Sequence, residues 1–196
     1  MTRYFEIRPE LKKYFGNEGT FTDPRDGNVY KTVEINGQTW LAENLRFEGV
    51  KHYTPNLQRN IRDKPKDINP DNITEFGFLY TWYSAMRACP EGWHLPTKEE
   101  FEELLNVAAT EQGLNLIAKV YGGKDTLGFK ALCAGGYDLE AKTCFFDNVY
   151  AFFWSATESY NGIDPAFFLS LGRYDNSFLI EDSEKNFALS VRCIKD

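Results

Sequence analysis

The sequence is poor in the residues that most often bind metal ions. It has only two histidines, His52 and His94, and its four cysteines include no CxxC pair. Structural zinc sites need closely spaced cysteine and histidine ligands, so neither a metal site nor a cofactor is expected. The acidic run 181–184 would attract a cation, but a solvated loop is the simpler interpretation.

Clusters of basic residues and long apolar runs are missing as well. The chain carries 22 Lys and Arg against 29 Asp and Glu, a net charge of −7. Phosphate binding needs clustered positive charge, so neither nucleic acid nor an anionic membrane is an expected partner. No window reaches the roughly 18 apolar residues of a membrane helix, and the first ten residues hold no signal peptide. The compartment stays open: cytoplasmic, or secreted or at the cell surface if a leader was removed.

Aromatic residues, in contrast, are abundant. The 16 Phe, 11 Tyr and 4 Trp make up 16% of the 196 residues, and 42% of residues are hydrophobic. This composition is typical of a globular, β-rich chain rather than a disordered one. A single domain of this length buries roughly 70% of the surface that its unfolded chain exposes. The aromatic residues form a core, a binding platform or both.

The first clear element is a β-hairpin. Residues 28–35 alternate between apolar and polar, Asn36-Gly37 supplies the positive φ angles of a type I′ turn, and residues 38–42 return. Residues 1–20 are expected to form an N-terminal appendage with a short helical turn at 9–15. Residues 46–72, rich in proline, asparagine and charge, are expected to form a long surface loop.

Two helices are expected in the middle of the chain. The first spans 76–88, where four residues have the i, i+3, i+4, i+7 spacing of a buried helical face: Leu79, Trp82, Tyr83 and Met86. The second begins at Thr97, which forms a capping box with Glu100. Strands are expected at 128–133 and 143–146, on either side of a turn region at Gly135-Gly136, and at 152–157, 166–171 and 187–194. Two helices followed by a run of strands, with the last strand joining the N-terminal hairpin, indicate an α+β fold.

A series of motifs gives the chain a family resemblance. In chain order they are DPRDGNVYKTV (23–33), QTWLAENL (38–45), GFLYTW (77–82), AMRACPEGWHLPT (85–97), GFKAL (128–132), FWSAT (153–157) and SVRC (190–193). Together they resemble the Fibrobacter succinogenes major paralogous domain family, over a domain spanning 21–196. That family is defined by sequence and has no established activity. The resemblance implies a C-type-lectin-like fold, related to that of formylglycine-generating enzymes, with two helices packed outside the strands.

This fold also implies a disulfide, since it would bring Cys89, after the first helix, to Cys193 at the end of the last strand. A second disulfide, between Cys133 and Cys144, could join neighbouring strands, but this pair is not part of the family pattern. The chain-entropy model gives such disulfides roughly 4 to 5 and roughly 3 kcal/mol, respectively. Four thiols are the alternative in a cytosolic protein.

No catalytic apparatus is recognisable in the sequence. His94 has no acidic or nucleophilic partner at an informative spacing, and Ser155 lacks the glycines of a nucleophile elbow. Cys133 and Cys144 do not reproduce the reactive cysteine pair of formylglycine-generating enzymes. The sugar-binding motifs of calcium-dependent lectins are also missing, so calcium-dependent sugar binding is not expected.

The best candidate ligand surface lies on the turns between the last strands. Its residues are Tyr150, Tyr160, Asn161, Asp164, Arg173, Tyr174, Asp175 and Asn176. Tyrosine and asparagine suit polar recognition at a low cost in entropy, although solvent-facing loops are the simpler interpretation. The expected function is a non-catalytic recognition module for a glycan or a protein surface. The alternatives are an enzyme with a formylglycine-generating-enzyme-like fold and a purely structural domain.

Overall fold

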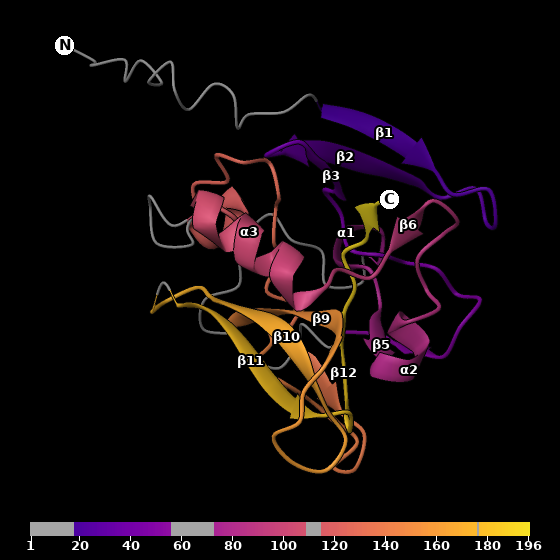
Figure 1. The fold of residues 1–196 in the computed structure, drawn as a ribbon, viewed down its shortest axis with the longest axis vertical. Helices are drawn as coiled ribbons and strands as arrows, with labels where there is room; N and C mark the ends of the chain where they lie inside the picture. The colour runs from indigo at the N-terminus through magenta and orange to yellow at the C-terminus, as the bar shows by residue number, and fades with distance from the viewer. Residues whose placement is uncertain (1–17, 56–72, 109–114, 176) are drawn as a thin grey trace.

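The computed structural model consists mainly of β-strands gathered into two sheets (Figure 1). It describes residues 18–55, 73–108, 115–175 and 177–196. The helical turn expected at 9–15, and residues 56–72 of the expected long loop, lie outside the described residues. In the described part, no helix is long and apolar enough to cross a membrane.

The five-stranded sheet is built on the N-terminal hairpin. Its order is β1 (Glu18–Thr22), β2 (Val29–Ile35), β3 (Gln38–Leu41), β13 (Ile194–Lys195) and β6 (Trp93–His94). The type I′ turn is confirmed, because Asn36 and Gly37 have φ angles of 52° and 80°. The predicted meeting of the hairpin with the C-terminal strand is confirmed as well, since Ile194 pairs with Trp40.

The second sheet contains eight strands. Its main path runs through β11 (Phe178–Glu184), β10 (Pro165–Gly172), β9 (Tyr150–Glu158), β12 (Phe187–Ser190), β5 (Leu79–Thr81) and β4 (His52–Tyr53). A short hairpin of β7 (Gly136–Asp138) and β8 (Thr143–Phe145) joins this sheet through β12. The described residues thus contain thirteen strands against three α-helices and one 3-10 turn (Lys119–Tyr121).

The prediction of an α+β, C-type-lectin-like fold with two helices is therefore wrong. The helices α1 (Ile73–Phe76) and α2 (Trp82–Ala85) span four residues each, and α3 (Lys98–Ala108) spans eleven. The predicted helix at 76–88 breaks into the end of α1, strand β5 and α2. Gly77 explains the break: its φ is +65°, and a Cβ there would lie 2.5 Å from the Leu45 carbonyl oxygen.

The helical spacing within 76–88 was misleading for a physical reason. Leu79, Tyr80 and Thr81 are all buried, as in a strand covered on both faces, whereas a helix would bury one face. Tyr83 and Met86, which the helix would have buried, are 53% and 45% exposed.

The capping box of α3 is confirmed: the Glu100 amide donates to the Thr97 hydroxyl (3.2 Å), and the Thr97 amide donates to the Glu100 carboxylate (2.8 Å). Figure 1 shows α3 between the two sheets, where Phe101 stacks on Trp40.

Three further expectations in the second half of the chain are wrong. Residues 128–133 form a single bridge, Ala131 to Ile117, instead of a strand. Gly136, expected in a turn, lies in β7. The acidic run 181–184, expected as a loop, is the second half of β11, which pairs with β10 along its whole length. Phe178 and Ile180 pack against the core and hold β11 in the sheet.

Of the two predicted disulfides, the structure contains one. Cys89 and Cys193 are joined across a sequence separation of 104 residues. Cys133 and Cys144 remain thiols, the former buried and the latter half-buried. Strand pairing keeps them apart, because Cys144 lies opposite Tyr137 while the Cys133 carbonyl accepts a hydrogen bond from Asn148.

Candidate functional site

The second sheet carries a groove lined by aromatic rings, which we call the aromatic groove. It has a volume of about 470 Å³, within the range of small-ligand sites. Its lining residues come from β8 to β12 and the adjoining turns: Phe145, Phe146, Tyr150, Phe152, Phe168, Ser170, Asp175, Ser177, Leu179, Glu181, Ser183, Phe187 and Leu189.

The strand register brings these side chains to one face. Leu179 of β11 lies opposite Ser170 of β10, which lies opposite Phe152 of β9. In the next row, Glu181 lies opposite Phe168. Because alternate residues of a strand point to the same face, the residues between them point to the other side and form the core. The groove is thus the second face of strands whose first face is buried against the interior.

The β7–β8 hairpin closes the groove on its other side. In the sheet, β12 and β7 separate β8 from β9. The ring of Phe145 on β8 nevertheless lies 5.9 Å from the ring of Phe152 on β9, measured between centroids. Since strands separated in this way line one groove, the sheet is concave here. Gly136 makes the curvature possible, because a Cβ there would lie 2.5 Å from the Phe145 ring.

The rings form a continuous strip along the groove. Tyr150 stacks on Phe152 at 5.5 Å with an interplanar angle of 8°, and Phe152 contacts Phe168 edge-on at 5.8 Å. Phe145 adds a contact to Phe187 at 5.2 Å. The strip reaches solvent, since Phe146 is 55% exposed. Leu179 is also exposed, at 53%, whereas Phe152 is buried, so the strip is partly open to solvent. Apolar surface that is exposed in a groove marks a ligand or partner site.

A polar rim lies beside the rings. The Tyr150 hydroxyl donates to Asp175 at 2.7 Å, and the amide and hydroxyl of Ser177 donate to the same carboxylate at 3.0 and 2.8 Å. The hydrogen bond raises the pKa of Tyr150 and, together with the Ser177 bonds, lowers the pKa of Asp175. Asp175 is therefore charged and fixed in orientation.

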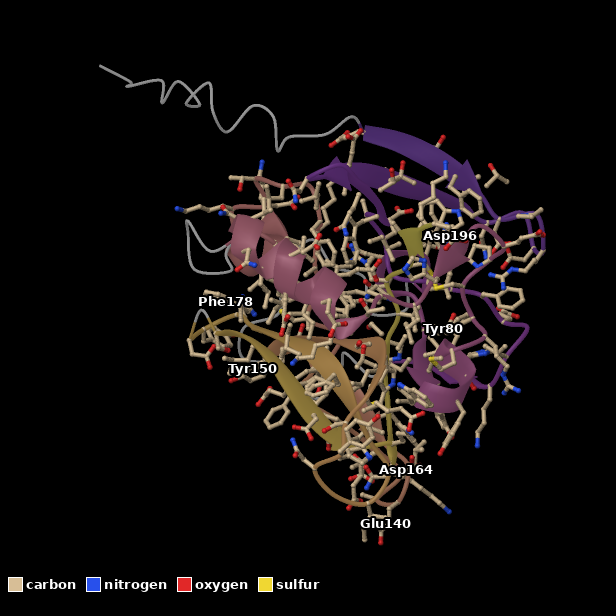
Figure 2. All side chains as sticks on the ribbon, in the orientation of Figure 1. Tyr80, Glu140, Tyr150, Asp164, Phe178 and Asp196 are labelled. Carbon is tan, nitrogen blue, oxygen red and sulfur yellow. A yellow bond between two sulfur atoms is a disulfide. The ribbon has the colours of Figure 1, made fainter. Side chains whose placement is uncertain are left out.

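The structure divides the predicted site residues between two ends of the β9–β10 hairpin. Tyr150 and Asp175 line the groove, and Arg173 and Tyr174 adjoin it. Tyr160, Asn161 and Asp164 lie on the loop at the other end of β9, a nine-residue strand that spans roughly 26 Å. Figure 2 shows Tyr150 and Asp164 well apart. Asn176 lies outside the described residues.

Asp164 is engaged in a separate cluster at that far loop. Its carboxylate accepts hydrogen bonds from Lys185 at 2.5 Å and from the Tyr83 hydroxyl. The Lys185 ammonium is also 3.3 Å from Glu158 and lies 3.9 Å above the Trp82 ring. These contacts tie the loop to β11, β12 and α2, which is a structural role.

Sequence reasoning missed most of the groove. The phenylalanines fall within predicted strands, and Glu181 belongs to the acidic run predicted as a solvated loop, so neither was predicted to line a ligand site. The alternation at 150–154 and 178–184 was the available signal, but a pattern of period two does not tell which of its faces is covered.

The candidate catalytic residues of the sequence are held in structural contacts. His94 has two acidic partners: Asp196 at 2.6 Å on Nδ1 and Glu100 at 2.9 Å on Nε2. Ser155 is fully buried, and its hydroxyl accepts a hydrogen bond from the Thr157 amide. Burial raises the pKa of the Cys133 thiol to about 12, which disfavours the reactive thiolate.

The fold and the groove together define a β-rich domain with a concave, aromatic-lined sheet face. A scan against protein-family models matches the Fibrobacter succinogenes major domain over residues 33–195, most of the chain. The chain belongs to this family. Searches of curated proteins and of solved structures found no match. The feature of this chain that points to a ligand is the groove itself.

Proposed function

We propose that this domain is a non-catalytic recognition module that binds a glycan in the aromatic groove. The observation that carries the proposal is the strip of connected rings from Phe187 to Phe168, bordered by an oriented carboxylate and serine hydroxyls. A pyranose ring has an apolar face of C–H groups and a periphery of hydroxyls. Aromatic faces pack against the former, and the rim accepts hydrogen bonds from the latter.

The shape of the site favours a glycan over a protein surface. A stable protein interface engages roughly 20 to 30 residues on each partner, whereas 13 described residues line this groove, with polar groups beside its rings. Serine hydroxyls from β10 and β11, Ser170 and Ser183, add donors and acceptors within the groove. Polar groups beside an apolar surface suit the hydroxyls and the C–H face of a sugar.

The chemistry of the rim supports binding rather than hydrolysis. A glycosidase needs a carboxyl group whose pKa is raised, so that it can protonate the leaving oxygen. The pKa of Asp175 is shifted the other way, by the hydrogen bonds from Tyr150 and Ser177. Its contacts make it a fixed acceptor.

The test is isothermal titration calorimetry with neutral oligosaccharides, using Phe146→Ala and Tyr160→Ala. Phe146 is an exposed ring of the groove, and Tyr160 is a 98% exposed ring at the far loop. Losing one stacking ring should weaken binding about tenfold, while Tyr160→Ala should leave it unchanged. Equal losses in both variants, or no binding of any oligosaccharide by the unaltered domain, would contradict the proposal.

A further inference from the structure

The described residues that line the aromatic groove carry only negative charge. Among them Asp175 and Glu181 are charged at neutral pH, and none is Lys, Arg or His. Glu181 lies on β11 opposite Phe168, and within the described part of the chain no cation pairs with it. The groove thus presents at least one carboxylate that is not neutralised.

The basic side chains that directly follow β10 and β11 in the chain contact other partners. Arg173 follows β10, but its guanidinium donates to the carbonyls of Tyr121 and Asn148 at 3.2 and 3.3 Å. Lys185 follows β11, and its ammonium is held by Asp164 and Glu158 at the far loop. Neither cation lines the groove, so the negative charge there acts directly on a ligand.

The rings add to this preference for positive charge. An aromatic ring is negative on its face, so a cation above it is attracted, more strongly where water is displaced. Phe146, Tyr150 and Phe168 lie in the same groove as the two carboxylates. The carboxylates and the negative ring faces would both repel an anionic sugar in this groove. The same two features would both attract an ammonium group.

Building on the proposed function, we infer that the groove selects glycans by charge: it prefers a polymer of amino sugars, accepts a neutral polymer more weakly and rejects a uronic-acid polymer. The protonated amine lies against Glu181 and the adjacent Phe168 ring, and the sugar ring stacks on the aromatic strip. Glu181 is then the residue that determines specificity, and the rings supply the affinity common to all glycans.

The experiment measures affinities for β-1,4-linked hexamers of glucosamine, glucose and glucuronate at about pH 6, below the ordinary pKa of an amine. We expect the glucosamine hexamer to bind about fivefold more tightly than the glucose hexamer, as for an exposed ion pair. The glucuronate hexamer should bind more weakly than either. Raising the salt concentration should reduce these differences, because exposed charges are screened.

The matched variants are Glu181→Gln and Glu140→Gln. Both remove one negative charge from an exposed position, but Glu140 lies after β7, outside the groove (Figure 2). Glu181→Gln should make the affinities for the glucosamine and glucose hexamers equal without weakening the binding of the glucose hexamer. Glu140→Gln should preserve the order of the three affinities.

If the glucose hexamer binds but the charge of the hexamer has no effect on affinity, or if Glu181→Gln keeps the order of affinities, the inference is overturned and the proposed function stands. If none of the three hexamers binds, both are overturned.

Discussion

Among single residues, Arg192 places a charged guanidinium in the interior, where it needs hydrogen-bond partners. It is completely buried, and its guanidinium donates to Asn44 at 2.7 Å and to the carbonyls of Leu41, Phe129 and Lys130. Burial lowers its pKa to about 9, so it remains protonated at neutral pH. One side chain thereby links the N-terminal hairpin, residues 128–130 and the C-terminal segment.

Replacing Arg192 by Met should destabilise the domain strongly. The substitution keeps the apolar stem but leaves buried acceptors without donors, which costs about 3 kcal/mol or more of the free energy of unfolding. Urea denaturation followed by circular dichroism measures this loss. Arg87→Met is the control at an exposed site and should change stability by no more than about 0.5 kcal/mol. Equal stability of the two variants would show that the Arg192 hydrogen bonds contribute nothing.

His94 predicts a dependence of stability on pH. Burial disfavours the charged ring, but the hydrogen bonds and charges of Asp196 and Glu100 outweigh it and raise the pKa of His94. Because the folded pKa exceeds the unfolded value, the stabilisation is complete below about pH 6.5 and disappears as the pH rises through the folded pKa. The difference in stability between the native chain and His94→Gln should therefore shrink from about pH 6 to pH 9. The ring is 38% exposed, so this difference should stay below about 1 kcal/mol. A difference that grows with pH would contradict this assignment.

Among the elements, the turn between β10 and β11 depends on Gly172. A Cβ at this position would lie 2.0 Å from the Asp175 carboxylate and 2.4 Å from the Ser177 hydroxyl. Gly172→Ala should therefore displace Asp175 from Tyr150 and return the pKa of Tyr150 toward its ordinary value. A pH titration of tyrosine ring signals by NMR reports this pKa. If it stays raised in the variant, Gly172 does not position the rim.

An element can be predicted from the sequence when the residues that determine it are neighbours in the chain, and not when distant strands determine it. The N-terminal hairpin and α3 were predictable because the turn Asn36-Gly37 and the capping residues Thr97 and Glu100 act locally. The segment 76–88 was not, since Leu79 to Thr81 are strand only because β12 and β4 pair with them. The second half of β11 was missed for a related reason. Its acidic residues are typical of a loop in the sequence, and they form a strand because they pair with β10.

The same distinction applies to the candidate site. Tyr150 and Asp175 were found because a turn rich in polar residues is visible in the sequence. The phenylalanines of the groove were not, because residues from β8, β9, β10 and β12 meet only when the sheet curves. Asp164 has the sequence character of a ligand residue, yet Lys185, 21 positions later, engages its carboxylate.

For the molecule as a whole, the disulfide between Cys89 and Cys193 is the main covalent constraint. It closes a loop with a sequence separation of 104 residues, which in the chain-entropy model is worth about 4 kcal/mol or more. Reduction, or the double substitution Cys89→Ser and Cys193→Ser, should lower the free energy of unfolding by about that amount. Denaturation with and without reductant measures it, and Cys133→Ser and Cys144→Ser should leave the effect of the reductant intact. An unaltered midpoint on reduction would contradict this role.

An NMR titration that locates the bound glycan tests binding in the aromatic groove most directly. Backbone amide signals of the labelled domain are followed as a neutral β-1,4-linked oligosaccharide is added. Binding in the groove should give saturable shifts confined to β8 to β12 around Phe146, Tyr150, Phe168 and Glu181, with no change at Tyr160. Saturable shifts at the Tyr160 loop or on the five-stranded sheet, with a silent groove, would contradict it.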